Sequence, residues 1–176
     1  MRTRKPIRFI ALIPHRDSAA LIERYRTRLF AAGVAGAYSF PVAAPLAAVS
    51  RAFTPSELKN LARTLRNTNP VISFGTLREE SWPPFTFCGP ELNMTPPELA
   101  EDRVLWRCSP PLLCAALITT GESRSLPPPP TGSFRAALVA NLIIRALGQG
   151  HRAYSFEWNT GTPFWLPTRR RSLRLF

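Results

Sequence analysis

The chain has 176 residues, of which 45% are hydrophobic and 19% are charged. This length and hydrophobic content suit one domain with a sizeable buried core. The 19 prolines interrupt the chain too often for a coiled coil or a bundle of long helices. Basic residues number 23 against 11 acidic ones, so the net charge of +12 also excludes a strongly acidic disordered protein.

The first elements expected along the chain are a strand and a helix. Residues 7–13 form a compact apolar run that ends at Pro14, which predicts a buried strand. Asp17 or Ser18 then caps a helix with a regular apolar face, and Gly33 ends that helix.

A second strand and a second helix follow. The uncharged residues 37–49 predict a strand, in which Pro41 and Pro45 indicate an edge position or a bulge. Residues 54–57 (TPSE) give the clearest local signal, because the threonine caps the backbone, the proline fits the first turn and the glutamate reaches back to the cap. The helix that they open is expected to stop near Asn67.

The second half of the chain is expected to consist mostly of strands. A repeat of the capping pattern at residues 95–98 (TPPE) predicts one or two helical turns between them. A run of prolines predicts a stiff linker over residues 124–133, inside a single domain of residues 1–176. The expected strands cover residues 71–77, 85–88, 103–107, 112–119, 152–158 and 164–166, and residues 134–145 form a strand or a helix. This order of elements indicates an α+β fold with two sheet-forming halves.

The positive charge is carried almost entirely by arginine, with only Lys5 and Lys59 as lysines. The planar guanidinium suits phosphate, so a polyanion is the expected partner, although a GC-rich coding bias would also favour arginine. Six of the 11 acids lie between Glu79 and Asp102, so the charge is uneven and suits an anionic partner on one side. The basic clusters at the two ends are Arg2, Arg4, Lys5 and Arg8, and Arg169, Arg170, Arg171 and Arg174.

Aromatic residues recur at every second position in two expected strands, at Tyr38 and Phe40 and from Tyr154 to Trp158. Such rings either belong to the core or form an open face on which RNA bases stack. Trp158 and Trp165 flank the last turn beside the C-terminal arginines, which makes them the best local candidates for contact with RNA.

The cysteines Cys88, Cys108 and Cys114 include no C-x-x-C pair, so buried reduced thiols are expected, without a metal site or a cofactor. Residues 29–50 carry no charge, but glycines and prolines interrupt them, which argues against a membrane span. The apolar residues 9–13 are too few for a signal peptide. We therefore expect a soluble cytoplasmic protein.

Four segments together suggest a known family: residues 8–12 (RFIAL), the helix at residues 54–66, residues 104–106 (VLW) and residues 134–141 (FRAALVAN). They resemble the two-histidine phosphoesterase superfamily, which includes the RNA ligase-like 2',3'-cyclic RNA phosphodiesterases. The resemblance implies two pseudo-repeated lobes of antiparallel sheet with the helices outside. It also implies a groove where two H-x-[ST] motifs face each other and supply the acid, the base and the hydroxyls that hold phosphate.

This chain departs from that pattern at both motifs. The second histidine position falls on Ala137 and its hydroxyl position on Val139, and the first motif falls on residues 44–47 (APLA). A methyl or isopropyl group transfers no proton, so no catalytic residue can be carried over. The resemblance therefore describes a degenerate member.

Three functions remain open. The favoured one is a non-catalytic or weakly catalytic protein that binds RNA or another phosphate ligand. The second is a phosphoesterase that acts on RNA ends or cyclic nucleotides with His15 and His151, each followed by arginine. The third is a structural subunit that holds a larger assembly with its basic ends and offers residues 31–49 as an interface. The residues expected to bind RNA are Arg2, Arg4, Lys5, Arg169, Arg170, Arg171, Arg174, Trp158 and Trp165.

Overall fold

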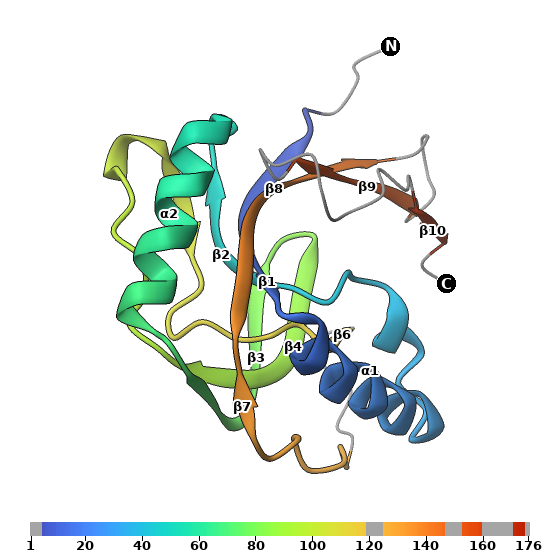
Figure 1. The fold of residues 1–176 in the computed structure, drawn as a ribbon. Coiled ribbons are helices and arrows are strands. Elements are labelled where there is room, and N and C mark those ends of the chain that lie inside the picture. The colour runs from blue at the N-terminus through green and yellow to red at the C-terminus, as the bar shows by residue number, and fades with distance from the viewer. Residues whose placement is uncertain (1–4, 119–124, 147–152, 160–170, 175–176) are drawn as a thin grey trace.

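The computed structural model describes residues 5–118, 125–146, 153–159 and 171–174, and it shows two antiparallel sheets with two α-helices (Figure 1). The larger sheet has six strands in the order β10-β9-β8-β1-β2-β5, and the smaller has the order β6-β4-β3-β7. The elements are β1 (Ile7–Pro14), α1 (Arg16–Ala31), the 3-10 helix η1 (Ala35–Tyr38), β2 (Ala44–Val49), α2 (Pro55–Thr68), β3 (Ile72–Trp82), β4 (Phe85–Asn93), the 3-10 helix η2 (Glu101–Arg103), β5 (Val104–Arg107), β6 (Ala116–Leu117), β7 (Ser133–Phe134), β8 (Ala136–Ala146), β9 (Ala153–Asn159) and β10 (Arg171–Arg174). The α+β class is confirmed, and all strand pairs of the described residues are antiparallel.

The first strand, β1, lies inside the larger sheet because its apolar run can be buried on both faces. Ile10 and Leu12 pack in the core beneath α2. Phe9, on the other face, meets the ring of Phe87 from β4 edge-to-face at 5.7 Å. Because successive side chains of a strand point to opposite faces of the sheet, this one hydrophobic run contributes to two cores. α2 covers one face of β1, and the smaller sheet covers the other.

The first helix, α1, begins two or three residues earlier than predicted, because it is capped by His15 rather than by Asp17 or Ser18. The imidazole Nδ1 of His15 accepts a hydrogen bond from the backbone N–H of Asp17 at 3.5 Å. Ser18 is buried, and its hydroxyl accepts instead from the backbone N–H of Arg135. Gly33 follows the end of the helix with a φ of 86°, a left-handed conformation that suits glycine, as predicted.

The expected strand over residues 37–49 is shorter than predicted, because η1 occupies its start. β2 lies between β1 and β5, so the edge alternative is wrong, while the predicted bulge is present where Pro45 pairs with Ala11. From Ala43 to Val49 most side chains are buried, as is Phe40, whereas Tyr38 is 43% exposed. Most of residues 31–49 therefore belong to the core of this chain, which limits the part of this segment that could serve as an interface to its exposed residues.

The second helix, α2, starts as predicted. Thr54 and Glu57 form the complete capping box, in which each side chain accepts a hydrogen bond from the backbone N–H of the other. Leu58, Ala62 and Leu65 lie on one face of the helix and are buried against the larger sheet.

The expected helical turn at residues 95–98 is absent. The side chain of Asn69 holds Thr95 at both backbone groups, accepting from its N–H at 2.8 Å and donating to its oxygen at 3.0 Å. Each proline of this segment also disfavours helical backbone in the residue before it, so the capping pattern has no helix to open.

Other differences concern the second half. The ambiguous residues 134–145 form strands β7 and β8, and within residues 112–119 the described strand is limited to β6. The expected strand at residues 164–166 lies outside the described residues. The proline-rich segment lies against α1, because the hydroxyl of Tyr25 donates to the carbonyl oxygen of Pro127 at 2.8 Å. None of the helices in the described ranges is long and apolar enough to cross a membrane.

Candidate nucleic-acid interface

One end of the six-stranded sheet is formed by both termini of the chain. Ile7, at the start of β1, pairs with Ile144 near the end of β8. Ile144 pairs with Phe156 of β9, and Phe156 pairs with Arg171 of β10. A single row of paired residues therefore connects the beginning of the chain to its last described strand.

The end of β2 reaches the same place from the other side of β1. Phe9 pairs with Ala48, so the chain leaves β2 level with the start of β1. Arg51 follows two residues after the end of β2 and is exposed. Antiparallel pairing thus places the start of one strand beside the end of its neighbour, and it gathers segments that are far apart in the sequence.

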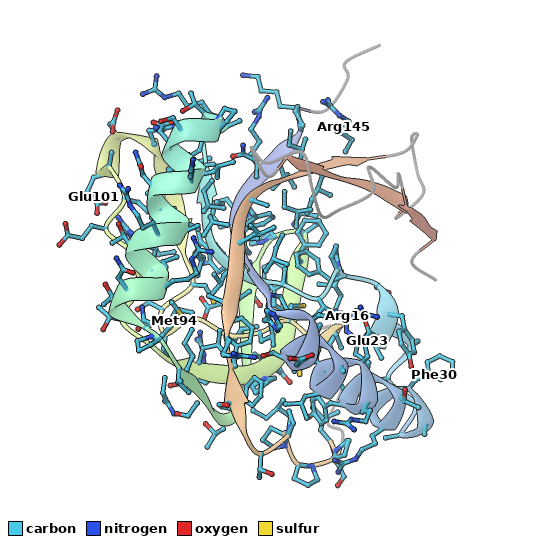
Figure 2. All side chains as sticks on the ribbon, in the orientation of Figure 1. Arg16, Glu23, Phe30, Met94, Glu101 and Arg145 are labelled. Atoms are coloured by element: carbon cyan, nitrogen blue, oxygen red, sulfur yellow. The ribbon has the colours of Figure 1, made fainter. Side chains whose placement is uncertain are left out.

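The basic residues of these segments form what we call the basic sheet end. Arg145 is exposed and lies, in the view of Figure 2, at the opposite end of the molecule from Phe30 on α1. Lys5 and Arg51 are also exposed, and Arg8 is half-buried. The members of the basic sheet end are Lys5, Arg8, Arg51, Arg145, Arg171 and Arg174.

The electrostatic environment of this end is strongly positive. Lys5, Arg8 and Arg51 form no ion pair with any carboxylate in the described part of the chain. The strands that meet here include a single acid among their described residues, Glu157, which pairs with Ile143. An end of the sheet at which cations outnumber carboxylates attracts a polyanion.

The sequence predicted part of this cluster. By strand register, Arg171 and Arg174 lie in β10 at this end, Lys5 precedes β1 there, and Trp158 is in β9, two residues from Phe156. The other expected RNA contacts, which are Arg2, Arg4, Arg169, Arg170 and Trp165, lie outside the described residues, as does His151.

Arg51 and Arg145 were missed by the sequence reasoning. Each is a single arginine in its own segment, so no run of charge marks it. Only the pairing of β1 with both β2 and β8 shows that the two residues share one end of the sheet.

The positions that the resemblance assigns to catalytic motifs lie on either side of β1 in the same sheet. Leu12 pairs with Ala44 on one side and with Val139 on the other. Leu12, Ala44, Leu46 and Val139 belong to one buried cluster, and each is at most 4% exposed. Hydrocarbon therefore fills these positions, and α2 helps to cover them through Leu58.

The alternative catalytic residue His15 serves a local role. Its Nδ1 caps α1 and lies 3.4 Å from Oδ2 of Asp17, and the side chain is 47% exposed. The same carboxylate oxygen is 3.5 Å from Nη2 of Arg135. Within the described residues, no three histidine, cysteine, aspartate or glutamate side chains are grouped so that they could hold a metal ion.

The three cysteines are free and buried, as expected. Burial is the largest influence on each thiol, and it raises the pKa of Cys88 and Cys108 to about 11 and that of Cys114 to about 12. Thiols that stay protonated near neutral pH are poor nucleophiles, so none of them suits covalent catalysis.

No protein family matches this sequence, no curated protein is detectably similar to it, and no solved structure matches its fold. The functional interpretation therefore depends on the register, burial and charge of the described residues.

Proposed function

We propose that this protein binds RNA through the phosphate backbone, as a non-catalytic or weakly catalytic module. The observation that supports this is the strand register, which puts basic residues of β1, β8, β10 and the segment after β2 at one end of the sheet. Phosphate contacts position a nucleic acid without reading its sequence, and they need exposed cations along one surface.

The composition of this end suits phosphodiesters. Five of its six members are arginines, whose planar guanidinium can donate two parallel hydrogen bonds to one phosphate. Arg8, Arg145, Arg171 and Arg174 belong to strands of one sheet, so backbone pairing fixes the spacing of their Cα atoms, and Lys5 and Arg51 lie next to strands. An array held in this way loses less conformational entropy when it binds an extended polyanion.

The residues at the two positions that the resemblance assigns to H-x-[ST] motifs favour a binding function over a catalytic one. If the two packed antiparallel sheets are the lobes of a degenerate two-histidine phosphoesterase fold, that scaffold has lost its acid and its base. Ala44, Leu46 and Val139 offer neither protons nor hydroxyls and are buried. We therefore place RNA at the basic sheet end and not at those positions.

The test is the salt dependence of binding to a fluorescein-labelled single-stranded oligouridine. An Arg51→Ala/Arg145→Ala double variant is expected to bind about tenfold more weakly at low salt, and the slope of log K against log [NaCl] should fall by about one to two. A flat salt dependence of the unaltered protein, or no binding at low salt, would overturn the proposal.

The matched control is Arg24→Ala/Arg28→Ala, which removes the same charge from exposed positions on α1. That helix follows the end of β1 opposite to Ile7. Its affinity and slope should stay close to those of the unaltered protein. Equal losses in the two variants would mean that net charge alone attracts the RNA.

A further inference from the structure

The outer edge of β3 is open over most of its length. β7 covers only its first two residues, where Ile72 pairs with Phe134 and Ser73 with Ser133. Thereafter one backbone bond joins the N–H of Phe74 to the carbonyl of Gly132. From residue 76 to residue 82, β3 has no partner on this side in the part of the chain that the structure describes.

The hydrogen bonds of β4 show which groups of β3 face the open side. The carbonyl of Thr86 accepts from Ile118, and that of Cys88 accepts from Ala115, so both residues direct their backbone away from β3. Residues opposite each other in an antiparallel pair either face each other or both face away. Ser81 pairs with Thr86 and Glu79 with Cys88, so their N–H and C=O groups point to the open edge.

This edge differs from the other outer strands. β5 and β10 have four residues each, and β6 and β7 have two, whereas β3 has 11. Proteins usually protect an edge by keeping it short, by a bulge, or by placing proline or charged side chains, above all lysine, in it. Residues 76–82 of β3 contain neither lysine nor proline, their charged residues are Arg78, Glu79 and Glu80, and the side chains of Glu79 and Ser81 are exposed.

Residues 76–82 contain one basic and two acidic residues, so their net charge is −1 although the chain as a whole is basic. Glu79 is exposed and forms no ion pair with a described residue. The guanidinium of Arg78 is held by the carboxylate of Glu80 and the carbonyl of Pro110, and its Nε lies 3.9 Å from the carboxylate of Glu91. Arg78 therefore compensates its neighbours and not Glu79.

We infer that this edge binds an extended basic segment of another protein, which adds a strand beside β3. The backbone groups of Glu79 and Ser81 would supply the hydrogen bonds, and the carboxylate of Glu79 would favour lysine or arginine in the added strand. A second copy of this chain fits less well. Two β3 edges paired antiparallel about Glu79 would place these carboxylates opposite each other.

The experiment uses a synthetic peptide of alternating lysine and valine, and hydrogen exchange of the whole protein. With the peptide, the amides of Glu79 and Ser81 should exchange at least tenfold more slowly, while those of Arg78 and Glu80, which face β4, should change little. The same peptide with N-methyl groups along the backbone edge that would pair with β3 should lose this protection. Equal protection by both peptides, or none by either, would overturn the inference.

Two variants test whether the peptide binds at Glu79 and Ser81 of β3. Glu79→Lys is expected to weaken peptide binding about tenfold, whereas Glu98→Lys, an exposed acid outside the strands, should leave it unchanged. Ser81→Pro removes an N–H that points outward, so it should abolish peptide binding. The variant should still fold, because an edge strand tolerates proline at such a position. If the protein instead dimerises and Ser81→Pro makes it monomeric, the occupant is a second copy and the inference is wrong.

Discussion

At the basic sheet end, Lys5, Arg8 and Arg51 have no carboxylate partner in the described part of the chain, whereas arginines around η2 and β5 are held by acids and carbonyls. Nη1 of Arg103 lies 2.5 Å from Glu57, and Nη2 of Arg107 lies 2.6 Å from Glu101. The two regions thus both contain basic residues, but acids of the described chain pair with those around η2 and β5 and not with Lys5, Arg8 or Arg51.

This difference shows why net charge alone is a poor guide to function. Arg26 is a second example of a basic residue with a structural role. It is 3% exposed and donates from Nη2 to the carbonyls of Phe40 at 2.6 Å and Cys114 at 3.0 Å. That arginine joins α1 to two later segments, and it is not available at the surface. A polyanion meets only those cations that the fold leaves exposed, and their location is decided by strand register.

The largest effect is expected at Arg103, a buried arginine that is paired with an acid. Arg103→Ala should lower the free energy of unfolding by about 2–3 kcal/mol, because it removes hydrogen bonds to Glu57 and to the carbonyl of Ala52. It also removes the guanidinium that lies 3.9 Å from the ring centroid of Phe53. Urea unfolding measures the loss, and affinity for oligouridine should not change.

Arg107→Ala is the control for that variant. Its partner Glu101 has an 84% exposed side chain, so this ion pair is worth less than about 1 kcal/mol. If the two variants were equally stable, the distinction between enclosed and exposed arginines would not hold.

The next effect concerns binding and not stability. Arg171→Ala/Arg174→Ala should weaken oligouridine binding about tenfold at low salt, since both residues belong to the basic sheet end. The comparison is Arg107→Ala/Arg135→Ala, which removes two arginines already paired with Glu101 and Asp17. Fluorescence anisotropy should show little change for this second pair. A larger loss for the paired arginines would reverse the assignment of the two regions.

The sequence predicted local features better than distant ones. The capping box at Thr54 and the glycine that follows α1 depend on neighbouring residues, and both are present as expected. The cap at His15 was missed because an imidazole rarely has this role, whereas Asp17 and Ser18 are typical caps. The helix expected at residues 95–98 failed because a distant side chain, that of Asn69, holds Thr95.

The basic sheet end also combines residues that the sequence marks locally with residues that only the fold brings to the same place. Runs of basic residues marked Lys5, Arg171 and Arg174, but Arg51 and Arg145 join them only through pairing between strands. The open edge of β3 was equally hidden, because residues 71–77 and 85–88 predicted strands without saying which edges would be covered. Contacts between distant segments determine both surfaces, and periodicity does not report them.

The smallest expected effect is the pH dependence of stability that arises from the pairing of Glu57 with Arg103. Hydrogen bonds from Arg103, and then from the backbone of Thr54, lower the pKa of Glu57 from 4.5 to about 2. A carboxyl whose pKa is depressed on folding stabilises the protein above pH 4.5, and this contribution is lost as the pH falls towards 2. Urea unfolding between these pH values should therefore show a steeper loss of stability than in Glu57→Gln, which keeps the size of the side chain but does not titrate. The difference should be smaller than the effect of Arg103→Ala, because the side chain of Glu57 is 41% exposed and water screens the pair. Equal pH profiles of the two proteins would show that Arg103 holds Glu57 by geometry without favouring its charged form.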